Sequence, residues 1–484
     1  MSPFRSIVRP VAALLLAIAP AATACGDGRP AGLVKLPATP GAARAPLPSV
    51  GGAELVAQLG CAGCHPGVGG ANAARARSPT LAGIGGRRSA GYIFAYLADP
   101  SRARSGEGRE RMPDFHLDER ERLALTLYLG TLRGDGGGSA MHESALSDAD
   151  SRELDAAFRR ASKANPGITA AVGARIFTAL DCAACHRQPG VAQWLSGPDL
   201  SVEGSRARAG WLRAFLAKPY ALRPFGAYPG TGSRMPDFQL SADEVDSLAA
   251  YLGTRRAALP PVDSQPRLSL FARHEVESLL RDRLPCLGCH RLDGEGGRIG
   301  PELSSAGSRL RPEYIRAIIT DPLHSAPGTI MPRTPMPAAE ATRIAAYLAG
   351  RDSAPARPAE VERAGYLSLV DNPPSTPATG TGAAALYGRI CANCHGAAGG
   401  GDGWNAGYLP VRPTRHSDAK YMSTRTDGTL YDGIAAGGYV LDRSNRMPAF
   451  GETLSRDEIG SLVRYIRKLC DCQGPPWSRD GAER

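Results

Sequence analysis

The sequence predicts an all-α protein made of four small domains in tandem, joined by linkers rich in proline, glycine and alanine. Three observations lead to this prediction. The pentapeptide C-x-x-C-H occurs four times in 484 residues, at intervals of roughly a hundred residues. A Met-Pro pair follows each copy, and a stretch with amphipathic helical spacing follows each pair. A chain of this length is also expected to form three or four domains.

The C-x-x-C-H motif is the attachment sequence for c-type haem. Two thiols on one short turn reach two vinyl groups of one porphyrin, and the adjacent His supplies an axial ligand to the iron. A redox dithiol or a zinc site would not require the fifth-position His, and zinc would need further ligands at close spacing. Four covalently bound haem c groups are therefore expected on Cys61 and Cys64, Cys182 and Cys185, Cys286 and Cys289, and Cys391 and Cys394, with the axial ligands His65, His186, His290 and His395.

The first residues of the chain have the pattern of an export signal. Arg5 and Arg9 precede an apolar stretch, and small residues precede Cys25. The apolar stretch is too short for a transmembrane anchor, and Pro20 interrupts it. We therefore expect residues 1–24 to be a signal peptide and the protein to be periplasmic.

Cleavage before Cys25 would leave an N-terminal cysteine, which resembles the lipobox of bacterial lipoproteins. Ala22 departs from that pattern, which prefers Leu at this position. We expect lipid attachment at Cys25, with residues 25–50 as an extended tether rich in Pro, Ala and Gly. The alternative is a free or disulfide-bonded thiol in a soluble protein.

Segments rich in chain-breaking residues, around 134–166, 255–266 and 351–382, divide the remainder into four units. The first three units share a pattern. A Pro-x-Leu sequence follows the haem motif, then a short helical stretch runs from an aromatic residue to a proline, and a Tyr stands sixteen residues after the Met of each Met-Pro pair. The predicted domains are residues 51–134, 167–254, 267–350 and 383–472.

The start of the last helix is readable in two units. Ser241 with Glu244, and Ser455 with Glu458, fit the capping box, in which a hydroxyl and a carboxylate satisfy each other's backbone amides. The fourth unit has a longer glycine-rich run after its haem motif, residues 396–403. We interpret it as a divergent form of the same module.

Each unit resembles a class I cytochrome c domain. The resemblance implies a small all-α fold in which the N- and C-terminal helices cross beside the haem, with Met as the second axial ligand. It also implies that a proline carbonyl accepts the proximal imidazole N–H. The matching ligands are Met112, Met235, Met331 and Met447, and the matching prolines are Pro79, Pro198, Pro301 and Pro410, with Pro413 as an alternative in the fourth unit.

The third unit has two Met-Pro pairs. Met336 has the more typical separation from His290, but Met331 reproduces the sixteen-residue spacing to Tyr347. Met336 then falls where Leu117 and Leu240 stand in their units, which is an apolar core position. We therefore predict Met331 as the ligand. A Met that only fills the core is the alternative at every such position.

Several further residues have no assigned role. Any His outside the motifs is a possible replacement for Met on an iron, but a solvated surface position is expected for His116, His142, His274, His324 and His416. Cys470 and Cys472 form either a tight disulfide or a pair of free thiols.

The formal charge is +10, and loss of Arg5 and Arg9 lowers it by two. Four haems would add eight propionates, so a nearly neutral holoprotein is expected. No Lys/Arg run or interleaved aromatic pattern indicates nucleic acid binding.

Filled axial positions favour electron transfer over catalysis. The expected partners are redox proteins: a donor dehydrogenase or membrane complex, and an acceptor cytochrome or oxidase. The architecture distantly resembles multihaem cytochrome c subunits of membrane-associated dehydrogenases. Two alternatives are a haem enzyme of peroxidase or sulfur-oxidation type, in which one open haem is fed by the other three, and a cytochrome that mainly docks partners in a membrane complex or filament.

Overall fold

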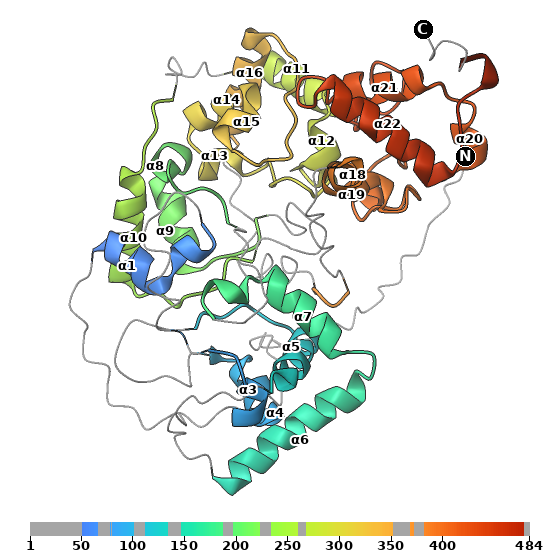
Figure 1. Cartoon of the computed structure of the whole chain (residues 1–484). Helices are drawn as coiled ribbons and strands as arrows, with labels where there is room; N and C mark the ends of the chain where they lie inside the picture. The colour runs from blue at the N-terminus through green and yellow to red at the C-terminus, as the bar shows by residue number, and fades with distance from the viewer. Residues whose placement is uncertain are drawn as a thin grey trace, which may run out of the picture. The chain divides into compact units, whose positions relative to one another are not determined.

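The computed structural model describes residues 51–65, 78, 80–100, 112–133, 147–186, 197–222, 234–259, 268–351, 368–371 and 382–478. The predicted signal peptide, Cys25, the tether, Pro79 and His142 lie outside these residues. The regular elements of the described part are almost all helices (Figure 1). The exceptions are one short hairpin, in which β1 (Arg291–Leu292) pairs antiparallel with β2 (Glu295–Gly296), and two isolated β-bridges, Asp114 with Asp237 and Ala207 with Leu310. The all-α prediction is confirmed.

We call the four predicted units modules one to four. Their helices are given in chain order. Module one has α1 (Gly52–Leu59), η1 (Cys61–Gly63), α3 (Ile84–Arg87), α4 (Ala90–Tyr96) and α5 (Glu119–Thr131). Module two has α7 (Ala170–Ala179), η3 (Cys182–Ala184), α8 (Glu203–Arg206), α9 (Ala209–Ala217) and α10 (Ala242–Thr254).

The helices of modules three and four are likewise given in chain order. Module three has α11 (Leu270–Ser278), its π-helical continuation η4 (Leu279–Arg283), α12 (Cys286–Cys289), α13 (Ala306–Arg309), α14 (Pro312–Thr320), α15 (Pro322–Ser325) and α16 (Ala338–Ala349). Module four has α18 (Ala383–Ile390), α19 (Ala392–His395), η5 (Ala406–Tyr408), α20 (Ala419–Met422), α21 (Asp427–Ala436), α22 (Arg456–Cys470) and η6 (Pro476–Ser478). No helix of the described ranges has the length and apolar character needed to cross a membrane.

The last helices of modules two and four begin as predicted. Ser241 and Ser455 each accept a hydrogen bond from the backbone N–H of a Glu three residues on, and that Glu accepts one from the cap residue. Helix α5 has the same box, formed by Asp118 and Glu121. These boxes fix where the helix behind the Met-Pro pair starts in modules one, two and four, whereas α16 of module three begins after Pro337 without a side-chain cap.

The segment 134–166 is more than the linker we predicted. It contains α6 (Asp148–Ala164), which begins at Ser147, whose hydroxyl accepts from Asp150 N. Leu154 and Ala161 are buried, and Phe158 packs edge-on against Phe94 of α4, with ring centroids 6.1 Å apart. These three apolar residues have the i, i+4, i+7 spacing of an amphipathic helix. The composition of the segment, taken alone, had indicated a linker.

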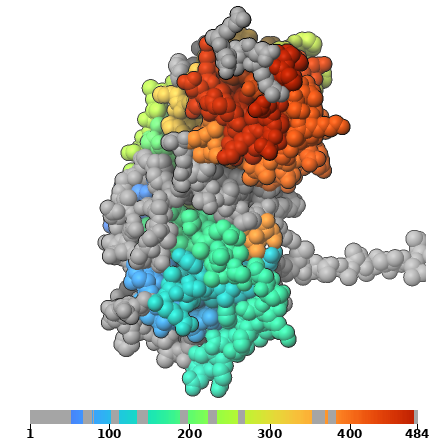
Figure 2. Space-filling view, turned by 45° about the vertical axis from the view of Figure 1, so that its right-hand side comes forward, coloured from blue at the N-terminus to red at the C-terminus, as the bar shows by residue number. Residues whose placement is uncertain are grey.

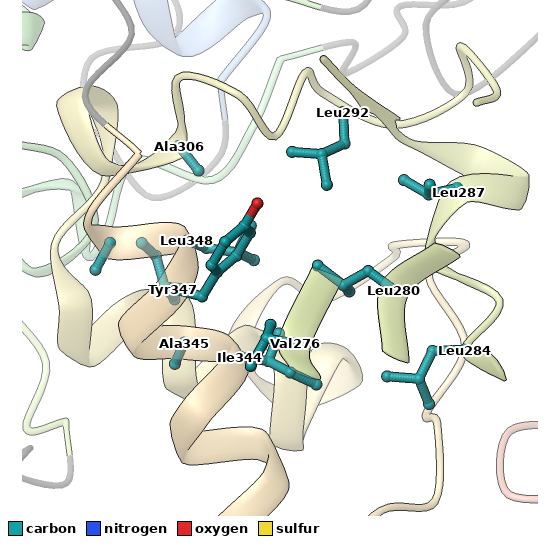
Figure 3. Close-up of a cluster of buried hydrophobic side chains, with 12 residues drawn as sticks. Val276, Leu280, Leu284, Leu287, Leu292, Ala306, Ile344, Ala345, Tyr347 and Leu348 are labelled. Atoms are coloured by element: carbon teal, nitrogen blue, oxygen red, sulfur yellow. The ribbon is translucent and has the colours of Figure 1, made fainter. Parts of the chain in front are cut away.

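Module three packs its own first and last helices together. Val276 and Leu280 of the first helical stretch lie against Ile344, Tyr347 and Leu348 of α16 (Figure 3). Module four does the same with α18 and α22, where Leu386 and Tyr387 share a core with Leu462 and Ile466. Both follow the crossing of terminal helices that the resemblance implied.

Modules one and two differ, because their first helices are exchanged. Helix α1 packs against α10 of module two, with Leu55, Val56 and Leu59 in one core with Leu248 and Leu252. Helix α7 packs against α5 of module one (Figure 1). The haem motif after each first helix moves with it, and the later helices, α3 and α4 in module one and α8 and α9 in module two, stay with their own last helix.

The core around α5 and α7 also includes a distant part of the chain. Ile176 and Phe177 of α7 pack against Leu125 and Leu129 of α5, and Leu369 is buried among them. Residues 368–371 form the small orange patch beside the green and blue-green surface in Figure 2, separate from the larger orange and red surface of module four. The segment after module three therefore helps to cover the core of the first two modules.

Candidate haem-attachment site

All four C-x-x-C-H motifs fold into one helical turn. In each, the backbone N–H of the His donates to the carbonyl of the first Cys at 2.9 Å. This turn places the two thiols on one side of the backbone, and the His side chain lies next to them in the chain. None of the eight motif cysteines forms a disulfide.

The eight motif cysteines are half-buried, and their thiols are largely desolvated. Burial raises the pKa of Cys61 and Cys391 to about 12 and that of Cys286 to about 11. A reactive dithiol or a thiolate ligand requires a lowered pKa. Within the described ranges, no group of three or more His, Cys, Asp or Glu side chains is arranged to hold a metal ion. The thiols therefore have the environment of neutral groups for covalent attachment.

The third motif shows how the imidazole is held. His290 Nδ1 lies 2.8 Å from the carbonyl of Pro301, the predicted partner, and Gly300 N donates to Cys289 O at 2.7 Å. A Cβ at Gly300 would lie 2.4 Å from the His290 ring, so only glycine permits this approach. Because a carbonyl only accepts, Nδ1 carries the proton and Nε2 keeps its lone pair for iron.

In the first motif the same arrangement uses a residue from the other module. His65 Nδ1 lies 2.9 Å from the carbonyl of Pro198, which we had matched to the second motif. Burial lowers the pKa of His65, which keeps its ring neutral. The role expected of Pro198 is therefore present, but toward a different His.

In the fourth motif the predicted proline is wrong. His395 Nδ1 lies 2.9 Å from the carbonyl of Thr414, and neither Pro410 nor Pro413 takes this role. The glycine-rich run makes the loop longer: Gly401 N donates to His395 O, and Gly396 and Gly401 have positive φ values of 79° and 70°. The chain therefore returns to the imidazole later than a fixed spacing from the motif suggests.

Each candidate Met ligand has a traceable position. Met112 packs against the core that contains Cys182, and Met235 against the core that contains Cys61. Met447 is held near Gly438, whose N–H donates to the Met447 carbonyl at 3.1 Å. Ligation by these side chains stays a prediction.

The two methionines of module three have different surroundings. Met336 packs against the hydrophobic core of that module, as Leu117 and Leu240 do in theirs. Met331 is half-buried, and its backbone N–H donates to Thr329 Oγ1 at 3.1 Å. Met336 also shares this core with Cys286, as Met112 does with Cys182 and Met235 with Cys61, so the choice of Met331 as the ligand stays a prediction.

Of the histidines outside the motifs, His274 and His324 are exposed and His116 is half-buried. His416 is buried, contrary to expectation. Its ring stacks on that of His395 with centroids 4.1 Å apart, and its Nδ1 shares a 2.9 Å hydrogen bond with Tyr387 Oη. His416 therefore links the haem-motif His395 to Tyr387 of α18, an arrangement that the spacing of the motifs does not predict.

We predict that His416 makes module four acid-sensitive. Burial, followed by the neighbouring His395, holds the pKa of His416 well below its usual value, so the unfolded chain binds a proton that the folded chain does not. Stability is therefore complete above about pH 6.5 and falls as the pH drops below it. The urea midpoint of module four, followed through the fourth haem, should fall between about pH 7.5 and pH 5 in the wild type and change less in His416→Phe. An unchanged pH dependence in that variant would contradict this role.

Cys470 and Cys472 form a disulfide at the end of α22. This settles the alternative that the sequence left open for these two residues. Asp471 between them has a left-handed backbone, with a φ of 46°.

Small helical modules that each open on a thiol pair followed by a His, with the imidazole anchored to a carbonyl at His65, His290 and His395, define a c-type cytochrome. Residues 49–133, 170–256 and 283–351 match the family model for cytochrome c. Residues 378–466 match the model for cytochrome C oxidase, cbb3-type, subunit III. A comparison with curated proteins gives no match. The chain belongs to the c-type cytochromes and consists of tandem class I cytochrome c domains.

The residues present fit haem c. The half-buried thiol pairs would hold the porphyrin, and His65, His290 and His395 each offer an Nε2 lone pair because Nδ1 is hydrogen-bonded to a carbonyl. The same motif turn at His186 places this residue for the same role. Cytochrome c domains bind haem covalently and transfer electrons, and this chain does so in several copies.

Proposed function

We propose that this protein is a periplasmic tetrahaem electron carrier that relays electrons between redox partners through four His/Met-ligated haem c groups. Each bound haem supplies an iron that gains or loses one electron. The observation that carries the proposal is the identical turn at all four motifs, in which the His N–H donates to the first Cys carbonyl. Filled axial positions make the protein a carrier rather than an enzyme.

Contacts between the first two haem motifs support a relay. A Cβ at Gly63 would lie 3.0 Å from the Cβ of Ala184, so the middles of the two motifs touch. Cys64 Sγ lies 3.9 Å from Oδ2 of Asp181, the residue before the second motif. Two haem attachment points on neighbouring turns suit the exchange of electrons between them.

The third and fourth motifs are also adjacent. Asn405 Nδ2 donates to Gly288 O at 2.9 Å and lies 3.4 Å from Cys394 Sγ, while Asn405 Oδ1 accepts from Arg298 N at 2.8 Å. One buried amide thus joins the turn of the third motif to a cysteine of the fourth. The four motifs are therefore grouped as two neighbouring pairs.

The proposed partners are a donor dehydrogenase or membrane complex and an acceptor cytochrome or oxidase. The match of module four to a family named for an oxidase subunit supports an acceptor of the oxidase type at that end. We propose that the signal-like N-terminus exports the chain and that a lipid on Cys25 holds it at a membrane. The mass of the mature N-terminal peptide tests this, and an unmodified Cys25 would exclude the anchor.

The haem count is tested by the intact mass of the purified protein. We expect the mass of four haems per chain. Each of four variants in which both cysteines of one motif become Ala should lose one haem, and Cys470→Ala with Cys472→Ala, the matched control, should lose none. A wild type with fewer than four haems, or a motif variant that loses none, would contradict the tetrahaem assignment.

A further inference from the structure

We infer that the first two haem sites are each built from both modules: the haem on Cys61 and Cys64 has the axial ligands His65 and Met235, and the haem on Cys182 and Cys185 has His186 and Met112. The inference rests on the haem attachment proposed above. It differs from the arrangement in which each Met serves the motif that precedes it. Three independent sets of contacts carry it.

The first set is the helix crossing. A Cβ at Gly52 of α1 would lie 2.1 Å from Ser247 O and 2.5 Å from Tyr251 Cβ of α10. A Cβ at Gly173 of α7 would lie 1.9 Å from Ala124 O and 2.7 Å from Tyr128 Cβ of α5. The two crossings are equivalent, since Tyr128 and Tyr251 are the tyrosines sixteen residues past Met112 and Met235. Each module thus supplies a first helix to the other.

The second set surrounds the imidazole. In module three, Gly300 N donates to Cys289 O at 2.7 Å, and a Cβ on that glycine would lie 2.4 Å from His290 Nδ1. At the first motif, Gly197 N donates to Cys64 O at 2.8 Å, and a Cβ there would also lie 2.4 Å from His65 Nδ1. The loop of module two at Gly197 therefore contacts the haem motif of module one in the same way as the loop of module three at Gly300 contacts the haem motif of module three.

The third set concerns the methionines, which stay with their own last helices. Met235 and Leu240 pack with Val245 and Leu248 of α10 and with Cys61, and Met112 and Leu117 pack in the core of α5 and Cys182. Gly85 of α3 lies against the Gly130 carbonyl of α5, and Gly204 of α8 lies against the Gly253 carbonyl of α10. In each module, the part of the chain after the haem motif therefore packs on its own last helix. Only the first helix and the haem motif are exchanged.

The two Met-Pro loops are also joined to each other. Asp114 N donates to Asp237 O at 2.9 Å, and Asp237 N donates to Asp114 O at 2.8 Å. Beside them, Arg234 donates to both carboxylate oxygens of buried Glu121, at 2.8 and 2.9 Å. Modules one and two therefore form one interlocked unit with two haem sites.

The full-length chain with Cys182→Ala and Cys185→Ala, which lacks the second haem, tests the assignment. In this background Met235→Ala should lower the Met-to-iron charge-transfer band by about a third and produce one high-spin haem, because Met235 serves one of three remaining irons. Met112→Ala should leave the band unchanged. The reverse pattern, in which Met112→Ala removes a third of the band and Met235→Ala does not, would overturn the inference.

The variant that lacks the first haem instead of the second is the control for structural damage caused by the loss of a haem. With Cys61→Ala and Cys64→Ala, Met112→Ala should remove a third of the band and Met235→Ala should have no effect. The intact mass identifies which haem is present in each variant. Absence of a haem from an unaltered motif would count against the proposed function, whereas full haem content with the ligands assigned within modules would overturn only the exchange.

A cleavage experiment on the otherwise unaltered chain gives a second test. A protease site inserted between Arg133 and Ser147 separates the two modules in sequence. If the helices are exchanged, the fragments should stay together after cleavage at high salt and separate only in denaturant, since Leu55 and Val56 are buried against α10. Separation at high salt without denaturant would contradict the exchange.

Discussion

Replacing Glu121 by Gln should destabilise modules one and two by about 3–5 kcal/mol, because it removes one charge of a buried, doubly hydrogen-bonded ion pair with Arg234. The Arg234 side chain is 4 % exposed and that of Glu121 is 0 % exposed. Glu121 also accepts hydrogen bonds from Asp118 N in the capping box and from Leu369 N. One carboxylate thus ties α5, the Met235 loop and the segment after module three together.

The measurement is the urea midpoint of the transition that releases Met ligation in the first two haems. The matched control is Asp371→Asn, which removes the partner of Arg120 next to Glu121 in α5. The side chains of that ion pair are 40 % and 54 % exposed, so its loss should cost less than about 1 kcal/mol. Equal effects of the two variants would show that the buried pair has no special role.

The second large effect is expected at the crossing of α5 and α7. In Gly173→Ala the new Cβ would lie 1.9 Å from the carbonyl oxygen of Ala124. This is far closer than a van der Waals contact, so the two helices must separate. Overpacking of this kind costs about 1–3 kcal/mol or more, and here it opposes the helix-propensity gain of about 0.5–1 kcal/mol from replacing a helical glycine.

The control for this variant is Gly210→Ala in α9, where a Cβ would meet nothing within 4 Å. The same substitution in that helix should be neutral or stabilising by up to about 1 kcal/mol. Thermal unfolding of both holoproteins measures the difference. A Gly173→Ala protein as stable as Gly210→Ala would contradict the close helix contact.

The sequence was informative where structure depends on neighbouring residues. The capping boxes at Ser241 and Ser455 and the turn of each C-x-x-C-H motif involve residues three or four apart, so they could be predicted from spacing. The core position of Met336 could be inferred because the repeat aligns it with Leu117 and Leu240.

The exchange of first helices could not be predicted in this way. Both α1 and α7 carry a glycine at the crossing, Gly52 and Gly173, and both partner helices present a Tyr there, so either pairing satisfies the local pattern. The choice depends on contacts between residues more than a hundred positions apart, such as His65 with the Pro198 carbonyl. Thr414 could not be predicted either, although it is only 19 positions from His395, because its place beside that ring depends on the conformation of the whole intervening loop.

A reductive titration of the purified holoprotein, followed by its visible and magnetic circular dichroism spectra, tests the central claim most directly. A carrier with four His/Met-ligated haems should take up four electrons per chain, with every haem low-spin in both oxidation states. Uptake of fewer than four electrons, or a high-spin haem in the resting protein, would contradict the account. The high-spin result would favour an enzyme with an open iron.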